Sequence, residues 1–449
     1  MDNDDGTNPM RILSILPGSG GSFYCQNCLR DMALAEALRR RGHAVTLMPL
    51  YLPATAHAPA PDDVPVFYGA VSLYLRHRSA WLRRLPRAWF APLDTWPVLR
   101  LAARLSGATS AAGLEELTLS MLRGEEGRQA DELQRVAEWV GALPPDERPE
   151  LIVLSNALLA GLARVLKHAA GCPVVCWLQD EHVWTDAMDP LLRASVLRVM
   201  TEDARAIDRF LAVSADYALR MAALLSIDRA RLSVVFPGID PAGYRPADPA
   251  RQPAVIGYLS RLSAEEGFDR FVDAFLLLRR DPRFASVRLA ATGGPAADRR
   301  FLARQMRKLK EAGAWADAEI DPSRFTRDRF GFLSGLSLLC VPGSQTPEAF
   351  GYYALEAMAA GVPLVLPAQG AFPELSAAAG CGVLTADARP ETLARAWAAL
   401  LADPERLRRE AAQGRAVACE RFSLDACAES FERAAGLTLG GGSRVPKRS

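Results

Sequence analysis

The chain has 449 residues, half of them hydrophobic, and a formal net charge of only +1. This length exceeds what one compact core usually supports, so two domains are expected. The near-neutral charge excludes a general electrostatic attraction to nucleic acid, and no uncharged run is long and apolar enough to predict a membrane span. The polar, acidic start is unlike a secretory signal, and most cysteines lie within apolar runs. A reducing, cytoplasmic setting is therefore expected.

Apolar, strand-like runs alternate with helix-forming segments in the first half of the chain. The first run, residues 11–16, leads into a glycine-rich turn at 17–22 and a helix expected over about 26–41. Further runs lie at 44–48, 151–154, 173–178, 210–213 and 232–235. This alternation predicts an α/β domain with a doubly wound, Rossmann-like parallel sheet over residues 10–240.

A basic helical insertion is expected within this domain, near residues 72–148. Residues 72–106 hold seven arginines against Asp94 alone, interleaved with tryptophans. Solvated arginines over a tryptophan-containing core are one interpretation. Peripheral contact with an anionic membrane surface is a second, and a grip on an anionic acceptor is a third.

Cys25 and Cys28 stand at the start of the first expected helix with Cys-x-x-Cys spacing. Three interpretations stay open: packing or lining of an acceptor pocket, a redox pair, and half of a zinc site. The sequence has no second Cys-x-x-Cys pair to complete such a zinc site.

Four polar residues follow the strand-like run at 173–178, namely Gln179, Asp180, Glu181 and His182. A histidine beside carboxylates can titrate near neutral pH, so these residues are candidates for a base on the acceptor side. A solvated turn with an incidental histidine is an equal alternative. A metal site is disfavoured because no fourth ligand is in view.

A turn-rich stretch at residues 237–249 is typical of an interdomain linker, and the alternation of strands and helices then restarts. A second Rossmann-like domain is predicted over residues 250–418. A C-terminal helix over 419–436 has the place in the chain to cross back to the first domain, and the tail at 437–449 is predicted to be disordered. Two such sheets bind ligands in the cleft between the carboxyl ends of their strands.

Glu348 and Glu356 stand eight positions apart between strand-like runs at 336–341 and 362–366. This order puts Glu348 on a loop at a strand's carboxyl end and Glu356 inside the next helix. The helix is expected to start near Phe350 and Gly351, where exposed N–H groups can bind phosphate while carboxylates bind hydroxyls. The pattern predicts a sugar-nucleotide site.

Arg261 ends a Gly257-x-x-x-Arg turn that follows the first strand-like run of the second half. There its fixed charge can face the cleft and stabilise a leaving diphosphate. The alternative is an ion pair with Glu265 or Glu266.

Together, the glycine loop, the Gly257-x-x-x-Arg261 turn and the Glu348-x₇-Glu356 pair resemble the retaining nucleotide-sugar glycosyltransferases of the GT-B fold, more narrowly glycosyltransferase family 4. The resemblance implies two Rossmann-like domains facing an interdomain cleft. It implies transfer of a hexosyl group from a nucleoside diphosphate sugar, by default a UDP-sugar, to an unidentified acceptor. No cofactor and no metal are expected.

The resemblance also implies roles for single residues. Glu348 would bind the donor sugar, Glu356 the ribose hydroxyls, and Arg261 the diphosphate. Glu374 would match a further glutamate of the family pattern. The remaining positions would contact the donor or acceptor through backbone groups; they are Gly20, Gly21, Phe350, Gly351, Tyr352 and Tyr353.

Three positions depart from the family pattern. Glu266 stands where a lysine is usual, Gln179 where a histidine is common, and Pro237 replaces an asparagine of the linker. One alternative function is therefore a catalytically impaired homologue that binds a sugar nucleotide or a partner. A redox or metal role at Cys25 and Cys28 is another.

Overall fold

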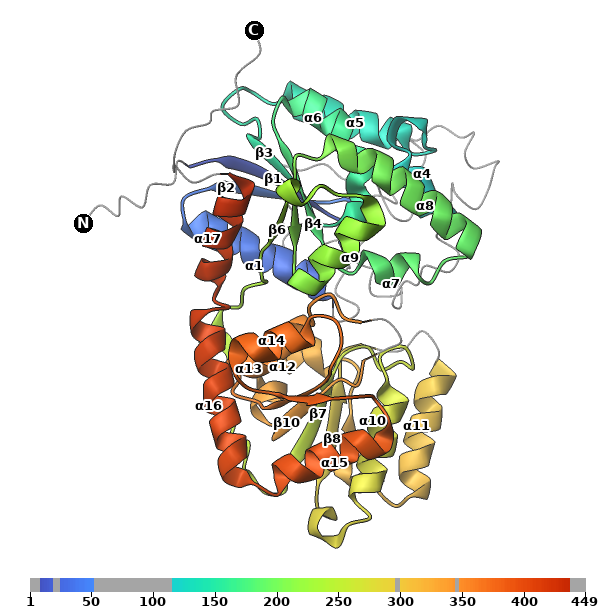
Figure 1. The fold of residues 1–449 in the computed structure, drawn as a ribbon, viewed down its shortest axis with the longest axis vertical. Helices are drawn as coiled ribbons and strands as arrows, with labels where there is room; N and C mark the ends of the chain where they lie inside the picture. Colours follow the sequence, from blue (N-terminus) through green and yellow to red (C-terminus); the bar gives the residue numbers. More distant parts are fainter. Residues whose placement is uncertain (1–8, 19–24, 52–114, 295–298, 344–346, 437–449) are drawn as a thin grey trace, which may run out of the picture.

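The computed structural model describes residues 9–18, 25–51, 115–294, 299–343 and 347–436. They form two six-stranded sheets, one in each half of the chain, with helices packed around each (Figure 1). Gly20, Gly21, the arginine-rich segment 72–106 and the tail 437–449 lie outside the described residues.

The first sheet has the strand order β2-β1-β3-β4-β5-β6, and every pair in it is parallel. Its strands β3 and β4 are buried along their whole length, as expected for continuous apolar runs in a parallel sheet. The strands are β1 (Arg11–Leu16), β2 (Ala44–Pro49), β3 (Leu151–Leu154), β4 (Val174–Leu178), β5 (Arg209–Ala212) and β6 (Leu232–Val234).

Helices connect these strands, and side-chain caps fix the starts of α8 and α9. Asp189 accepts hydrogen bonds at the start of α8, where Pro190 occupies the first turn, and Ser214 does the same for α9. The helices are α1 (Gln26–Arg40), α4 (Glu115–Leu122), α5 (Ala130–Ala142), α6 (Ala163–Ala170), α7 (Glu181–Thr185), α8 (Pro190–Asp203) and α9 (Ala215–Leu225). Helices α4 and α5 belong to the described part of the predicted insertion.

The second sheet has the order β12-β11-β10-β7-β8-β9, again with parallel pairs only. Its strands are β7 (Val255–Leu259), β8 (Arg288–Thr292), β9 (Ala318–Ile320), β10 (Leu338–Cys340), β11 (Leu364–Pro367) and β12 (Val383–Thr385). Its helices are α10 (Phe268–Leu278), α11 (Arg299–Glu311), α12 (Arg324–Ser334), α13 (Tyr352–Ala359), α14 (Phe372–Ala379), α15 (Pro390–Leu401) and α16 (Pro404–Glu420).

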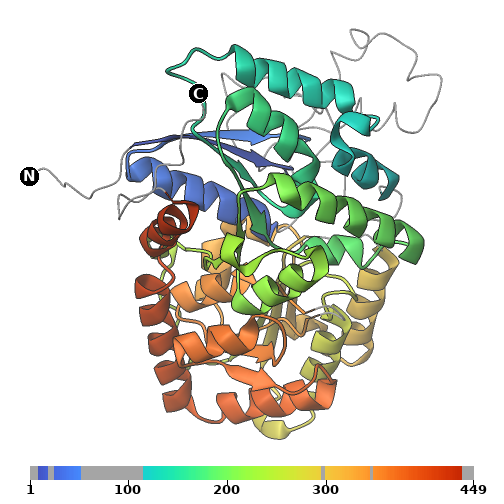
Figure 2. The ribbon, with the colours of Figure 1, turned by 45° about the horizontal axis from the view of Figure 1, so that its top comes forward.

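The last helix, α17 (Leu424–Ala435), leaves the second domain and lies beside α1 of the first (Figures 1 and 2). Phe431 stacks on Trp177 of β4 with ring centroids 6.3 Å apart. The fully buried Glu432 side chain accepts hydrogen bonds from Arg41 at 2.7 and 2.9 Å and lies 3.1 Å from His43 Nε2. This helix therefore fastens the two domains together at one edge.

Within the described residues, we find no helix both long and apolar enough to cross a lipid bilayer.

Candidate active site

The strand orders place one switch point in each sheet. In the first sheet the chain proceeds outward from β1 to β2 and then returns to β3 on the other side of β1. In the second sheet it proceeds outward from β7 to β8 and β9 and then returns to β10 on the other side of β7. Open parallel sheets bind ligands beyond the carboxyl ends of such neighbouring strands. Helix α1 starts after β1, Arg261 follows β7, and Glu348 follows β10.

Direct contacts join the two sides at this place. His182 Nε2 lies 2.8 Å from the Pro347 carbonyl oxygen, and Ser214 Oγ donates to the Ala349 carbonyl at 2.6 Å. The loop 347–351 of the second domain therefore rests on the first domain, with Glu348 in its middle.

Two glycines hold this loop in shape. Gly370 has a φ of 59°, and a Cβ there would lie 2.4 Å from the carbonyl oxygen of Glu348, to which the Ala371 N–H donates at 3.2 Å. Gly351 has a φ of 80° and packs so closely on the Phe372 ring that a Cβ would lie 2.5 Å from it. Side chains at either position would displace Glu348 or the start of α13.

Glu348 contacts a residue from each domain. Gln26 Nε2, from α1, lies 3.5 Å from Glu348 Oε2, and the Tyr353 hydroxyl lies 3.5 Å from Oε1. Burial raises the pKa of Glu348 well above its usual value, and the carboxylates of Glu266 and Asp180 add to this effect. Such a carboxyl group can both donate and accept hydrogen bonds.

Arg261 is paired within the site. Its Nη2 lies 2.8 Å from Glu266 Oε1, so the ion-pair alternative raised for this arginine is present. Burial acts to lower the pKa of Arg261. The charge of Glu266 and its hydrogen bond to the guanidinium together have the larger effect, so the pKa of Arg261 is raised. The Tyr258 hydroxyl donates to the backbone carbonyls of Arg261 at 2.8 Å and Glu266 at 3.2 Å, and so fixes both ends of the turn.

Asp180 brings a third carboxyl group to this place. It adopts a left-handed backbone conformation, with a φ of 56°, directly before α7. The Ala349 N–H donates to its carboxylate, whereas the buried Oδ1 has no hydrogen-bond partner among the described residues. Burial and Glu266 raise the pKa of Asp180 to about 6. In the described part of the chain, no group of histidine, cysteine or acidic residues has the arrangement of a metal site.

The next residues form a buried chain of hydrogen bonds. Glu181 accepts from the N–H groups of Ala157 and Gln179, both at 2.8 Å, and from the Tyr217 hydroxyl at 2.7 Å. That hydroxyl lies 3.1 Å from His182 Nδ1. This series of hydrogen bonds therefore runs from Gln179, just after β4, through Tyr217 on α9 and His182 to the Pro347 carbonyl, which precedes Glu348.

The pKa values of Glu181 and His182 differ from the sequence-based expectation. Burial lowers the pKa of His182 to about 4, with Arg220 adding to the effect, so the imidazole is neutral at pH 7. Burial raises the pKa of Glu181 to about 7. The neighbouring carboxylates thus do not tune His182 to neutral pH, because burial has the larger effect. Nε2 of the ring contacts the Pro347 carbonyl of the second-domain loop, while Nδ1 contacts the Tyr217 hydroxyl of the first domain.

Glu356 lies deeper than Glu348. It is fully buried on α13, where Tyr244 donates to its Oε1 at 2.7 Å and Arg329 Nε approaches the same oxygen at 2.7 Å. Glu374 has a different setting, because its carboxylate accepts from the backbone N–H groups of Ala215 and Asp216 at 3.0–3.1 Å. It thus caps α9 of the opposite domain.

The start of α13 is already occupied by protein groups. The Tyr352 N–H donates to Gln26 Oε1, and the Tyr352 hydroxyl donates to the Gly238 carbonyl at 3.0 Å. Phe350 is buried among aromatic rings, including that of Phe236 at a centroid distance of 6.2 Å. Tyr353 is likewise buried below Glu348.

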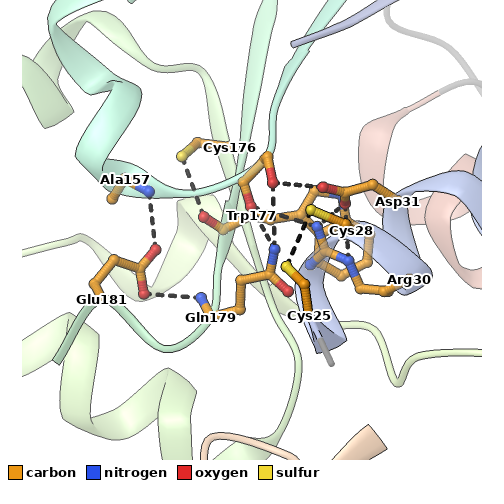
Figure 3. Close-up of polar contacts among 10 residues, drawn as sticks. Cys25, Cys28, Arg30, Asp31, Ala157, Cys176, Trp177, Gln179 and Glu181 are labelled. Carbon is orange, nitrogen blue, oxygen red and sulfur yellow. Dashed lines mark hydrogen bonds and ion pairs between the residues drawn. The ribbon is translucent and has the colours of Figure 1, made fainter. Parts of the chain in front are cut away.

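Cys25 and Cys28 lie beside Gln179 at the edge of the same site (Figure 3). Their sulfur atoms are 3.0 Å apart. Gln179 donates to the Ser155 carbonyl at 2.7 Å, and Arg30 and Asp31 complete the buried polar cluster below the cysteines.

Sequence reasoning did not single out Gln26, Tyr217 or Arg30. Gln26 bridges Glu348 and Tyr352, while Tyr217 joins Glu181 to His182. Tyr217 and Arg30 belong to no motif with recognisable spacing. The position of Gln26 between two cysteines at a helix start was the one available signal.

Comparisons with known proteins agree with this architecture. Residues 245–417 match the family model of glycosyl transferases group 1. The D-inositol 3-phosphate glycosyltransferase of Segniliparus rotundus is 29% identical over 254 residues, which cover 54% of this chain and 55% of that protein. The enzyme of the same name from Nocardia farcinica is 30% identical over 235 residues, covering 50% and 51%. The chain thus spans about half the length of the curated relatives it matches.

Two solved structures are similar over nearly the whole chain. Anabaena HepE in complex with UDP and glucose has a TM-score of 0.66 at 17% identity. The match covers 95% of this chain and 99% of the HepE chain. Sucrose-phosphate synthase from Thermosynechococcus elongatus has a TM-score of 0.66 at 17% identity, with coverage of 95% and 98%. The chain therefore has the GT-B fold predicted from its sequence, and its residues 245–417 match group 1 glycosyl transferases.

Proposed function

We propose that the protein is a glycosyltransferase that moves a hexosyl group from a nucleoside diphosphate sugar to an acceptor nucleophile. The family match covers the second domain, and one fold relative was solved with UDP and glucose. The observation that carries the proposal is the position of Glu348. It lies on the loop after β10, beside Arg261 and in contact with Gln26 of the opposite domain.

In this proposal Glu348 holds the donor sugar at the cleft. Because its pKa is raised, the carboxyl group can donate to one sugar hydroxyl and accept from another. Arg261 would face the diphosphate and stabilise its departure, and the start of α13 would join it once the Tyr352 N–H leaves Gln26 Oε1. Transfer with retention of configuration and without a metal is part of the proposal, with positioning and electrostatics as the contribution of the chain.

Further residues have roles that depend on the bound nucleotide. Since Glu356 is fully buried, a contact with the ribose hydroxyls requires the nucleotide to open its contact with Arg329 or Tyr244. Asp180 is the acceptor-side group that we favour as a base, because its pKa is about 6 and its Oδ1 has no hydrogen-bond partner among the described residues.

The test is hydrolysis and binding of UDP-glucose, followed by a panel of other nucleotide sugars. We expect slow release of UDP by the wild type and its loss in Glu348→Gln. Glu391→Gln, at an exposed position on α15, is the matched control and should keep wild-type rates. Equal rates in all three proteins would remove Glu348 from the reaction.

A second candidate function rests on the ion pair between Arg261 and Glu266. A carboxylate 2.8 Å from the diphosphate-facing arginine compensates its charge and repels phosphate. A protein that binds a nucleotide sugar weakly and does not turn it over fits this feature. Binding without hydrolysis or transfer across the panel, combined with tighter binding in Glu266→Gln, would favour this candidate over the enzyme.

A further inference from the structure

The Cys25–Cys28 pair is a chemically distinct feature that the proposed reaction does not use. Cys25 is the residue before α1, and Cys28 lies one turn later on the same helix. Both are thiols, and their sulfur atoms are 3.0 Å apart. A disulfide requires an approach of about 1 Å more, which side-chain rotation at two neighbouring positions can supply.

The two cysteines differ in access. Cys28 is only 4% exposed, whereas Cys25 is half-buried at the helix start. This is the arrangement of a pair in which one sulfur meets an external reagent and the other resolves the product. The buried partner is protected from a reagent but stays within reach of its neighbour.

The surroundings hold the helix start in place (Figure 3). Arg30 is 2% exposed, stacks on Trp177 at 4.1 Å and pairs with Asp31. Asp31 in turn accepts from Ser155 Oγ at 2.5 Å. Because this cluster fixes α1 directly below the cysteines, formation of a bond between them moves the sulfur atoms and the residues around Gln26 rather than the whole helix.

Other cysteines of the chain lack this setting. Burial raises the pKa of Cys172 to about 12, that of Cys381 to about 11 and that of Cys427 to about 11. These side chains stay protonated near neutral pH and react slowly, since the thiolate is the nucleophile. Among the described cysteines, the structure reports a sulfur–sulfur contact for Cys25 and Cys28 only.

We propose that Cys25 and Cys28 form a redox-active dithiol that exchanges with small disulfides such as glutathione disulfide. The Cys25 thiolate attacks the external disulfide, forms a mixed disulfide and releases one glutathione thiol. The Cys28 thiolate then attacks Cys25 Sγ and releases the second. The chain loses two electrons and two protons, and glutathione disulfide gains them as two thiols.

The redox state of this pair reaches the donor site through Gln26. Gln26 lies between the two cysteines, accepts from the Tyr352 N–H and lies 3.5 Å from Glu348. Closure of the disulfide shifts this residue and weakens one hydrogen bond at the cleft. This consequence rests on the proposed function, whereas the exchange chemistry does not.

The exchange is tested by incubating the full chain in glutathione buffers of graded redox potential, followed by alkylation and trypsin. Both cysteines fall in one tryptic peptide, residues 12–30. We expect this peptide to lose two hydrogens and resist alkylation at oxidising potentials. Cys28→Ser should trap one glutathione on Cys25, and Cys25→Ser should trap none on Cys28. Cys419→Ser, a half-buried cysteine on α16, should behave as the wild type.

Two results would overturn the dithiol assignment. One is peptide 12–30 with both cysteines alkylated at every potential. The other is stoichiometric zinc in the reduced chain that is lost in Cys25→Ser, since a metal site would then account for the pair.

The link to the donor site is tested by titrating UDP into the reduced and oxidised chain. We expect oxidation to weaken UDP binding by about two- to tenfold, the range for one hydrogen bond, and to have no such effect on Cys25→Ser. Equal affinities despite a closed disulfide would overturn the link. No UDP binding in the reduced chain would instead contradict the proposed function and leave the exchange chemistry standing.

Discussion

The two domains meet around the loop that carries Glu348 and at the contact made by α17, and carboxylates in these two regions have pKa values shifted in opposite directions. Burial alone would raise the pKa of Glu432 on α17, but hydrogen bonds from Arg41 and His43 outweigh it and lower that pKa. Around the Glu348 loop, burial and neighbouring carboxylates raise the pKa values of Glu348 and Asp180. The nearby Arg261 is already paired with Glu266 and compensates them only in part.

This difference separates a structural contact from a candidate ligand site. The carboxylate of Glu432 is balanced by Arg41 and hydrogen-bonded to Arg41 and His43, so it contributes to holding the domains together. Carboxyl groups left with raised pKa values and incomplete partners lower stability and are retained where a ligand completes them. The charges that the fold places beside a carboxyl group thus favour its ionised form in one region and its protonated form in the other.

The largest effect is expected for Glu348→Gln. Loss of a group that contacts the reacting sugar should reduce turnover of a nucleotide sugar by about 10²–10³-fold, the usual cost of one such electrostatic contact. Because the pKa of Glu348 is raised in the fold, its ionisation opposes folding at neutral pH. The variant should therefore unfold at the same temperature as the wild type or higher, as measured by calorimetry. A lower melting temperature would mean that Glu348 is structural.

The opposite behaviour is expected for Glu432→Gln, with a loss of about 2–4 kcal/mol in the free energy of unfolding at pH 7. The pKa of Glu432 is lowered in the fold, so its contribution is present above the unfolded value of about 4.3 and is lost as pH falls through the folded value. Urea unfolding at pH 7 and below pH 4 measures this difference, which should shrink at the lower pH.

The control for this variant lies on the same helix. Glu429 pairs with Arg433 at 2.7 Å, but both side chains are more than half exposed. Glu429→Gln should therefore change stability by less than about 0.5 kcal/mol. Equal losses in the two variants would show that burial of the ion pair does not decide its strength.

At the candidate site, Glu266→Gln and Arg261→Ala should change nucleotide affinity in opposite directions. Removing the carboxylate frees the charge of Arg261 and should tighten UDP binding by about 1 kcal/mol. Removing the arginine should weaken binding by about 1.5–3 kcal/mol, the scale of a charged hydrogen bond. Isothermal titration at low salt measures both. Unchanged affinity in Arg261→Ala would exclude this arginine from the diphosphate site.

The sheets could be predicted where strands are continuous apolar runs, as at residues 151–154 and 173–178. The three-residue strand β9 was not predicted, because its residues are partly exposed and form no apolar run. The α/β class followed from the alternation of strands and helices, the GT-B arrangement was implied by the family resemblance, and the fold relatives confirm both.

The site could be predicted only one domain at a time. The motif at Glu348 belongs to the second domain, but the contact of Glu348 with Gln26 joins residues 322 positions apart, and no spacing rule connects them. The same holds for His182 and Pro347, 165 positions apart. The lowered pKa of His182 was also beyond sequence reasoning, since it is set mainly by burial in the folded chain.

After the control variant Glu429→Gln, the smallest effect is expected for Glu374→Ala. This variant decides whether Glu374 is a structural carboxylate, like Glu432, or a ligand-site carboxylate, like the one proposed at Glu348. Its carboxylate accepts from backbone N–H groups at the start of α9 and lies at the surface. Loss of such a cap should lower the free energy of unfolding by about 0.5–1 kcal/mol, and turnover should fall by less than about threefold. Glu374→Gln keeps an acceptor oxygen but no charge, and should lose about half as much stability. A tenfold drop in turnover with unchanged stability would instead place Glu374 among the groups that contact substrate, because a helix cap acts on the fold and a ligand contact acts on the reaction.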